Sequence, residues 1–399
     1  MRRLAGVVLA AAAGLAAASA AAAQSLAWRV QTDGPVIGSP RLAGGRLYIG
    51  SGDGALYALD AATGAHRWKY ETGGAVDSTP ALDGGRLFVT SRAGAVHAVE
   101  ADTGRPAWVF RTGGERQADQ WDHYLSSPAV HGDLVLVGGG DGKVYALDQA
   151  SGRPRWSFET GGVVHADPVI AGGLVYVGSF DGVLYALDLA TGALRWRFDT
   201  EGEQYFPKGE VPKAVLVRDG VVYFGSRDYN LYALDAASGA LLWKRKEEGS
   251  WVVATPLMTD GDLFFGTSDT HAFYRVRGDG GATVWRLPLN MRVFGSAVAQ
   301  GDKVYFGASN GRLYAVSAAS GAIAWRFDTD GSRQAWDKVF DKADKIRDDL
   351  PRRPGEEPWQ AKERAILSLG SILGDPVVRD GLVYFGSHDG GVYAVREPQ

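Results

Sequence analysis

Short apolar segments recur along the whole chain, and turns rich in glycine and aspartate separate them. In Tyr57-Ala58-Leu59 successive side chains alternate between two faces, which is typical of a strand, and Asp60–Gly64 forms a predicted turn. Residues 45–51 predict a strand before it, joined to it by a tight Asp-Gly hairpin. An inner strand beginning near residue 38 and an outer strand at Trp68 complete a unit of four strands.

A tryptophan marks the outer strand of each copy of this unit. These tryptophans recur at intervals of about 40 residues, a period typical of propeller blades. A glycine stands four residues before all but the first of them, and a large ring on an outer strand can pack between neighbouring blades. The eight positions are Trp28, Trp68, Trp108, Trp156, Trp196, Trp243, Trp285 and Trp325.

The second strand of each unit counts the blades and gives eight. Its aromatic or leucine positions are Tyr48, Phe88, Leu136, Tyr176, Tyr223, Phe264, Tyr305 and Tyr384. The eighth unit has no tryptophan strand after it, but residues 28–34 closely match residues 325–331. We therefore expect the N-terminal strand to complete the last blade, which removes the open edge at the seam of the ring.

Blade six departs from the pattern. Arg275 stands where the other copies have alanine, and a guanidinium at that point needs an acidic partner or solvent. The sequence alone favours solvent, so the replacement of Arg275 by alanine is expected to be neutral or stabilising.

The repeated Asp-x-x-(Thr/Ser)-Gly-x-x-x-Trp pattern, preceded by Leu-Tyr-Ala-Leu, resembles the PQQ-like (quinoprotein-type) propeller repeat. The resemblance covers residues 24–399 and implies an all-β, eight-bladed β-propeller. Two groups of proteins carry this repeat: the quinoprotein dehydrogenases, and non-catalytic propellers that include the BamB outer-membrane assembly factor. The chain is similar in size and blade number to the BamB-like propellers.

Three links between neighbouring blades are longer than the others, and all three fall on the same face of a propeller. They span residues 114–124, 200–213 and 329–373. Loops that vary on one face are typical of a binding side. Residues 331–371 predict a helical insertion, with one helix through residues 336–350 and a second from Pro358 to just before Gly370. Their apolar stripe must pack on the propeller's own rim or on a partner protein.

The composition excludes several kinds of covalent bond and binding site. The chain of 399 residues has a net charge of −4 and no cysteine, which excludes disulfides, cysteine-based metal sites, attachment of c-type haem and an N-terminal lipid. No basic cluster suggests nucleic-acid binding. Arg2 and Arg3, an apolar stretch and Ala21-Ala22-Ala23 predict a signal peptide over residues 1–23, with no other membrane span. We expect an exported, soluble protein, periplasmic or secreted, that is not a lipoprotein.

The starts of the inner strands place polar side chains at the propeller's funnel. Carboxylates gathered there could hold a metal, and a tryptophan could stack on a planar ring, but polar groups also line any water-filled channel. Neither His-x-x-x-His nor His-Glu-x-x-His occurs, so we expect no metal site and no catalytic residue. The candidate binding residues are Asp77, His123, His165, Asp167, Lys213, Trp251 and Asp375.

Two functions remain open from the sequence. The first is a non-enzymatic binding or scaffold protein of the cell envelope, which holds an envelope protein or a small ligand on the insertion-bearing face. The second, implied by the resemblance, is a PQQ-dependent dehydrogenase or a quinone-binding oxidoreductase that uses PQQ with Ca²⁺. The chain is short for such an enzyme and lacks the cysteine pair that many of them carry, so we expect no cofactor.

Overall fold

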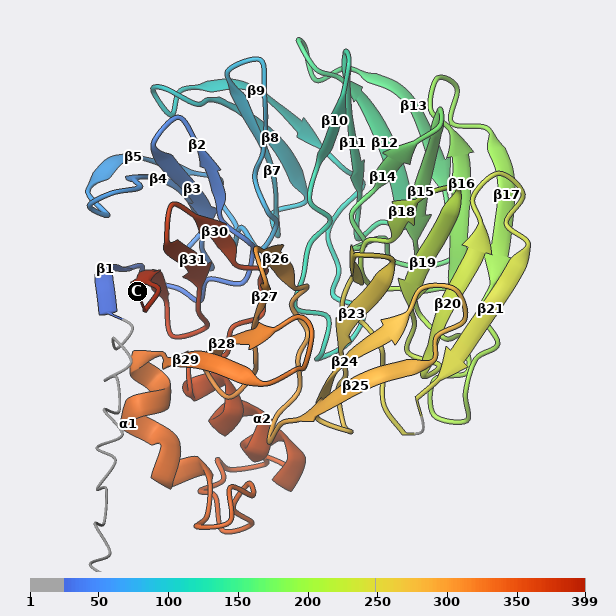
Figure 1. The fold of residues 1–399 in the computed structure, drawn as a ribbon. Helices are drawn as coiled ribbons and strands as arrows, with labels where there is room; N and C mark the ends of the chain where they lie inside the picture. The colour runs from blue at the N-terminus through green and yellow to red at the C-terminus, as the bar shows by residue number, and fades with distance from the viewer. Residues whose placement is uncertain (1–24, 248, 399) are drawn as a thin grey trace, which may run out of the picture.

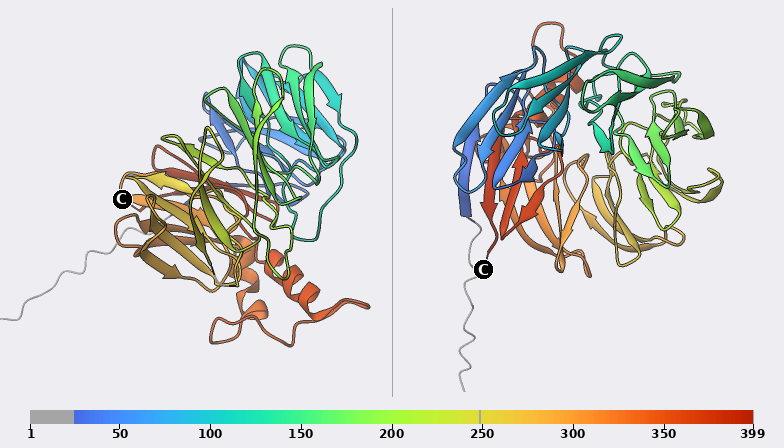
Figure 2. Two further views of the ribbon diagram at one scale, coloured as in Figure 1. Left: turned by 90° about the vertical axis from the view of Figure 1, so that its right-hand side faces the viewer. Right: turned by 90° about the horizontal axis from the view of Figure 1, so that it is seen from above.

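The computed structural model describes residues 25–247 and 249–398, so the predicted signal peptide lies outside the described residues. Eight four-stranded antiparallel sheets surround a central axis, as Figure 1 and the right-hand view of Figure 2 show. The first strands of neighbouring sheets contact one another, which places them at the centre. The eight-bladed propeller predicted from the tryptophan repeat is confirmed. None of the described helices is long and apolar enough to cross a membrane.

The strands follow chain order from the axis outward in the first seven blades. Blades 1 and 2 consist of β2 (Arg41–Ala43), β3 (Arg46–Gly50), β4 (Ala55–Asp60), β5 (His66–Glu71), β6 (Ala81–Asp83), β7 (Arg86–Ser91), β8 (Ala95–Glu100) and β9 (Pro106–Arg111). Blades 3 and 4 consist of β10 (Ala129–His131), β11 (Leu134–Gly138), β12 (Lys143–Asp148), β13 (Pro154–Glu159), β14 (Val169–Ala171), β15 (Leu174–Gly178), β16 (Val183–Asp188) and β17 (Leu194–Asp199).

The remaining blades repeat this plan until the seam. Blades 5 and 6 consist of β18 (Leu216–Arg218), β19 (Val221–Gly225), β20 (Asn230–Asp235), β21 (Leu241–Lys246), β22 (Leu257–Thr259), β23 (Asp262–Gly266), β24 (Ala272–Arg277) and β25 (Thr283–Pro288). Blades 7 and 8 consist of β26 (Val298–Gln300), β27 (Lys303–Gly307), β28 (Arg312–Ser317), β29 (Ile323–Asp328), β30 (Val377–Arg379), β31 (Leu382–Gly386), β32 (Gly391–Arg396) and the N-terminal β1 (Ser25–Gln31).

The N-terminal strand closes the ring, as predicted. β1 pairs antiparallel with β32, and Trp28 lies opposite Ala394. The Trp28 ring is 8% exposed and lies 6.0 Å from the ring of Tyr384. Because β1 supplies the outer strand of blade 8, the two ends of the chain form one sheet and leave no unpaired strand at the seam.

Seven of the eight outer-strand tryptophans also form a hydrogen bond to the next blade. The Trp28 indole Nε1 donates a hydrogen bond of 2.9 Å to the Ala61 carbonyl of blade 1. Gly64 in the same turn has φ +74°, and a Cβ at that position would lie 2.8 Å from the Trp28 ring. Position 64 therefore requires glycine for two reasons: the positive backbone angle and the close approach of the Trp28 ring. Trp325 differs, because blade 8 ends the chain without such a turn and its Nε1 has no partner among the described residues.

The longest link carries two helices between β29 and β30. α1 (Asp330–Val339) begins after Thr329, whose side chain accepts a hydrogen bond from the Ser332 backbone N–H. α2 (Pro358–Ser368) ends just before Gly370, as predicted. Figure 2 shows both helices projecting from one end of the propeller.

The prediction of one helix through residues 336–350 is wrong. The helix ends at Val339, and Phe340 instead forms an antiparallel bridge with Ile346. The Asp341 carboxylate accepts backbone N–H groups of Ala343 and Lys345 at 2.8 and 3.0 Å. This local turn competes with the helical hydrogen bonds and brings the apolar residues together without a helix.

The expectation of a solvated Arg275 is also wrong. Its Nε donates to the Asp262 carboxylate at 2.7 Å, and its terminal nitrogen donates to the Ala318 carbonyl at 3.0 Å. The side chains of Arg275 and Asp262 are 19% and 3% exposed. The irregular blade thus contains a largely buried ion pair, which reverses the expected effect of removing Arg275.

Candidate functional site at the mouth of the funnel

The three long links meet at one mouth of the propeller. Trp121 of the first, Phe206 of the second and Trp359 of the third line one groove together with Trp251. Trp121 and Trp251 have ring centroids 5.5 Å apart, and Phe206 lies 4.8 Å from Trp251. The added segments therefore pack on one another and build a shared surface over the funnel.

The three long links lie against residues at one position of the repeat. These residues were not among those predicted from the sequence. Between the second and third strands most blades carry Gly-Ser-x-Asp-Gly or a close variant, and the middle residue lies at the mouth. This position changes from blade to blade while its neighbours stay nearly constant. A comparison of the repeats at this position could have found the functional residues. Its eight occupants are Gly52, Arg92, Gly140, Phe180, Arg227, Ser268, Ser309 and His388.

His165 anchors the first link. Its Nδ1 lies 2.8 Å from the Asp122 carboxylate and its Nε2 lies 2.6 Å from Glu115, and the imidazole is 1% exposed. Both ring nitrogens can donate only when the imidazole is protonated. Burial lowers the pKa of His165, but the hydrogen bonds to Asp122 and Glu115 outweigh it and raise the pKa to about 9. A charged histidine between two carboxylates thus ties the link to blade 4.

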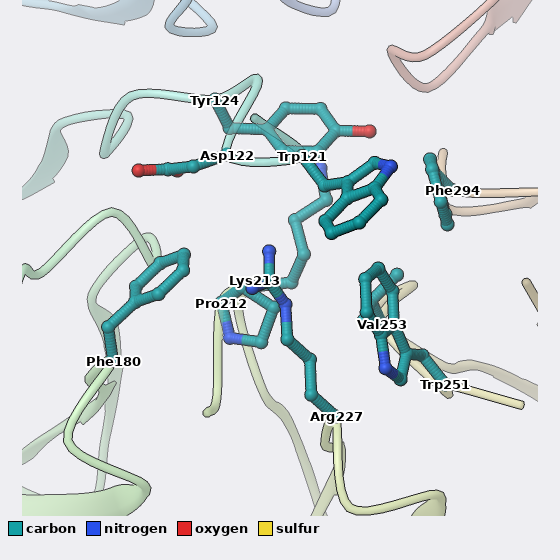
Figure 3. Close-up of a pocket in the computed structure, with 10 residues that line it drawn as sticks. All are labelled: Trp121, Asp122, Tyr124, Phe180, Pro212, Lys213, Arg227, Trp251, Val253 and Phe294. Carbon is teal, nitrogen blue, oxygen red and sulfur yellow. The ribbon is translucent and has the colours of Figure 1, made fainter. Parts of the chain in front are cut away.

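Arg227 anchors the middle of the same link. Figure 3 shows its guanidinium rising between the rings of Phe180 and Trp251, beneath Trp121. The ring centroids lie 5.0 and 4.7 Å from the guanidinium carbon. The side chain is 2% exposed and pairs with Asp119 of the first link. The cavity left among these residues has about 10 Å³, which is room for about one water molecule.

Four of the predicted residues, Asp77, Asp167, Lys213 and Asp375, line a small polar cavity on the axis below the mouth. Asp77 pairs with Arg92 at 2.5 Å, and burial raises the pKa of Asp77 although Arg92 opposes the shift. Asp167 accepts the Ser127 backbone N–H at 2.6 Å.

The charges in this cavity are largely balanced. Burial raises the pKa of Asp167 to about 6, although the charge of Lys213 opposes the shift. Asp375 accepts the Ser296 backbone N–H at 2.6 Å. The Lys213 ammonium lies 3.4 Å from the centroid of the Tyr124 ring. These groups are held by partners within the fold.

The other three predicted residues lie apart from this cavity. Trp251 belongs to the aromatic group at the mouth, and His165 belongs to the anchor of the first link. His123 is 9% exposed, and its Nε2 has no partner in the part of the chain that the structure describes. Burial lowers the pKa of His123 to about 4, so the ring is neutral near pH 7.

Trp359 on α2 lines two surface grooves. One, of about 300 Å³, is also lined by Trp121, Phe206 and Ile346, and the other, of about 440 Å³, is also lined by Leu367. Trp359 is 44% exposed. Beneath it, Arg292 and Glu363 form an ion pair of 2.9 Å that fixes α2 to the propeller.

The apolar stripe of the insertion packs mainly between its own two helices. Val339, Phe340, Ile366 and Leu369 form a buried cluster, to which the propeller adds Met291. The stripe is therefore covered within the protein, while Trp359 on α2 is left with much of its ring in solvent.

The residues of the funnel do not fit a quinone with calcium. Trp251, the candidate stacking platform, is 6% exposed, with Arg227, Phe206 and Trp121 around its ring. A tricyclic quinone needs a flat slot far larger than the cavity for one water molecule. Among residues 25–247 and 249–398 no three acidic or histidine side chains converge as metal ligands. Asp167 and Asp375 each bind a backbone N–H instead.

Solved structures show the same fold at low sequence identity. BamB from Moraxella catarrhalis matches with a TM-score of 0.69 and 18% identity, over 94% of this chain and 100% of that chain. A europium-containing methanol dehydrogenase matches with a TM-score of 0.70 and 14% identity, over 94% and 93% of the two chains. The quinohemoprotein alcohol dehydrogenase from Comamonas testosteroni gives 0.70 and 14%, over 94% and 76%. These likenesses establish the fold alone.

Sequence comparison goes further than the fold. A search of curated proteins found no significant match. Residues 12–120, 116–217 and 207–338, however, match the sequence family described as outer membrane protein assembly factor BamB. The matched segments span most of the chain, so this PQQ-like propeller belongs to the BamB family.

Proposed function

We propose that the protein is a non-enzymatic scaffold of the cell envelope that holds a protein partner on its insertion-bearing face. Three observations support the proposal. The family is described as an assembly factor. The funnel residues do not fit a quinone and its calcium ion. The three insertions form a surface with grooves instead of an open chamber.

The single observation that carries the proposal is the position of Trp359 in the walls of two grooves. A half-exposed indole flanked by apolar hollows is typical of the anchor residues that dominate protein interfaces. Lys362, Glu363 and Arg364 follow on the same helix, and together with Trp359 they line the two grooves. An aromatic centre with a charged rim is the usual anatomy of a binding patch.

The patch is already rigid before a partner arrives. Arg292 and Glu363 pair beneath it, and Arg364 pairs with Glu356 at 2.8 Å. The side chains of Trp121 and Trp359 support each other with ring centroids 5.9 Å apart. A partner therefore need not order these residues, which lowers the entropic cost of binding.

Affinity capture from envelope extracts tests the proposal. The Trp359→Ala variant is expected to lose most of the captured partner, because truncation of a central aromatic anchor weakens binding by about 2 kcal/mol or more. The matched control is Leu242→Ala, which removes a side chain that is 52% exposed on the outer strand β21. A partner that is retained by Trp359→Ala and lost from Leu242→Ala would place the interface on the outer wall and overturn the proposal.

We also propose export, from the basic and apolar pattern of residues 1–23. N-terminal sequencing of the protein isolated from its cells tests this directly. We expect the mature chain to begin at Gln24, since Ala21-Ala22-Ala23 supplies the small residues that precede a cleavage site. A protein that retains residues 1–23 in the soluble fraction of the cytoplasm would contradict export.

A further inference from the structure

The first long link contains an added segment whose limits the repeats define. After β5 the chain runs Thr72-Gly73-Gly74 and then Ala75-Val76. After β9 it runs Thr112-Gly113-Gly114, but the corresponding His123-Tyr124 follows only after residues 115–122. The link after β5 closes without such a segment, so residues 115–122 are an addition to a complete blade.

The added segment spans the mouth and is held mainly by charges. Glu115 and Asp122 bind His165 of blade 4 at 2.6 and 2.8 Å. Arg92 of blade 2 donates to the backbone carbonyls of Asp122 and His123 at 3.3 and 3.0 Å. These groups sit at the entrance of the funnel, so the segment covers it from blade 2 to blade 4.

Beneath the segment lies a slot built for an anion. The Arg227 guanidinium is almost completely buried between the rings of Phe180 and Trp251. Asp119 supplies the carboxylate that pairs with it, and the Arg227 Nε has no partner among the described residues. A planar guanidinium between two aromatic rings favours a carboxylate approaching along the open edge.

The segment presents a short pattern to this slot. Two residues after Asp119, the Trp121 ring packs against Trp251 and Trp359. The Asp119 side chain is 30% exposed, and residues 116–118 lie in solvent. Glu115 and Asp122 hold the two ends of the segment on His165, and its middle offers one carboxylate and one indole to the Arg227 slot, so a competing peptide with the same two groups could replace the middle.

We propose that residues 115–122 are an intramolecular plug, and that the slot beneath them recognises an acidic peptide segment of a partner protein. The recognised segment carries an aromatic residue two positions after an aspartate, and it displaces the plug. This inference deepens the proposed function and rests on its protein partner. The attached plug has a high effective concentration, so a partner segment must bind the slot more tightly than the plug does.

The test uses a short-link variant in which Gly114 is joined directly to His123, which gives the link the length that it has after β5. The probe is a synthetic peptide of residues 115–124 with a fluorophore, followed by fluorescence anisotropy. We expect the peptide to bind the variant and to bind the intact protein at least tenfold more weakly. An Asp119→Asn or Trp121→Ala peptide should bind the variant at least tenfold more weakly than the native peptide. Equal binding of the native and Asp119→Asn peptides, or no binding to a folded variant, would overturn the proposal.

A second measurement keeps the proposal testable if the short-link variant does not fold. In the full-length protein, Asp119→Asn should speed hydrogen exchange of the backbone amides in residues 115–122 and permit binding of the peptide. The matched control is Asp133→Asn, since Asp133 is a 71% exposed partner of Arg155 on the outer side of blade 3. Unchanged exchange in Asp119→Asn would overturn the plug. Neither experiment uses an envelope partner, so the plug can fail while capture through Trp359 still succeeds.

Discussion

The seam of the propeller offers a test in which two tryptophans serve as a matched pair. Trp28 and Trp325 are each 8% exposed on an outer strand, and each ring lies about 6 Å from a tyrosine of its own blade. They differ in one respect. The Trp28 Nε1 donates to the Ala61 carbonyl at 2.9 Å, whereas the Trp325 Nε1 has no partner in the described part of the chain.

We predict that Trp28→Phe is more destabilising than Trp325→Phe by about 1–2 kcal/mol. Both substitutions remove a similar part of a buried ring, so the loss of packing is comparable. Only Trp28→Phe also leaves the buried Ala61 carbonyl without its donor, and an unsatisfied buried acceptor costs about 1–3 kcal/mol. Trp28→Ala should cost about 3–5 kcal/mol, because it leaves a cavity between blades 8 and 1.

Equilibrium unfolding in urea, followed by far-ultraviolet circular dichroism, measures these differences. Leu26→Ala is the control on the same strand, since Leu26 is 44% exposed and its truncation should change stability by less than about 1 kcal/mol. Equal losses for Trp28→Phe and Trp325→Phe would refute the role assigned to the hydrogen bond. An unchanged midpoint for Trp28→Ala would refute the closure of the ring by β1.

Three further predictions follow from the contacts described above. Arg275→Ala should lower the free energy of unfolding in urea by about 2–3 kcal/mol, because it leaves the buried Asp262 carboxylate without its main partner, and a neutral result would contradict the ion pair. The pKa of His165 is raised to about 9, so its contribution to the free energy of unfolding is complete below pH 6.5 and is lost as the pH rises through 9. Over that range the wild type should lose up to about 3 kcal/mol of unfolding free energy relative to His165→Gln. Parallel pH profiles of the two proteins would contradict the anchoring role of His165. The mature protein supplied with pyrroloquinoline quinone and Ca²⁺ should not oxidise alcohols or aldose sugars in a dye-linked assay, and turnover that disappears in Asp167→Ala would contradict the proposed function.

The ring could be predicted from the sequence because its physical requirements repeat. The turn glycines must have positive φ and must accept a neighbouring indole, so Gly64 and its equivalents recur four residues before tryptophan. The match between residues 28–34 and 325–331 identified the closing strand, since both segments meet the same packing demands. The copies of a repeat can be compared with one another within one sequence, whereas a single motif allows no such comparison.

The helical insertion and blade six could be predicted only in part, because neither repeats. The apolar spacing of residues 336–350 fits a helix, but Asp341 forms a local turn that the spacing does not reveal. Arg275 looked solvated because its partner Asp262 lies on the neighbouring strand β23 and belongs to no motif. In both cases one side-chain interaction between specific atoms overrides a correct general pattern.

The mouth of the funnel was the least predictable region. Asp77, Asp167, Lys213 and Asp375 lie together around one cavity, because the start of each inner strand faces the axis. The partners of His165 and Arg227 were not predictable, since the first link brings Glu115, Asp119 and Asp122 across three blades. Contacts across the ring depend on the path of a non-repeating loop. Arg227 was overlooked because it occupies the hairpin position at which the repeats differ most.

The central claim is that the insertion-bearing face holds a protein partner, and site-specific photo-crosslinking in intact cells tests it most directly. A benzoyl-phenylalanine at position 205 is a mild replacement, because Tyr205 is 72% exposed and adjoins Phe206 in the groove beside Trp359. The same cross-linker at position 242 on the outer wall is the control. The account predicts a discrete adduct with an envelope protein from position 205 that disappears when Trp359 is changed to alanine. Adducts from position 242 alone, or adducts from position 205 that do not depend on Trp359, would contradict it.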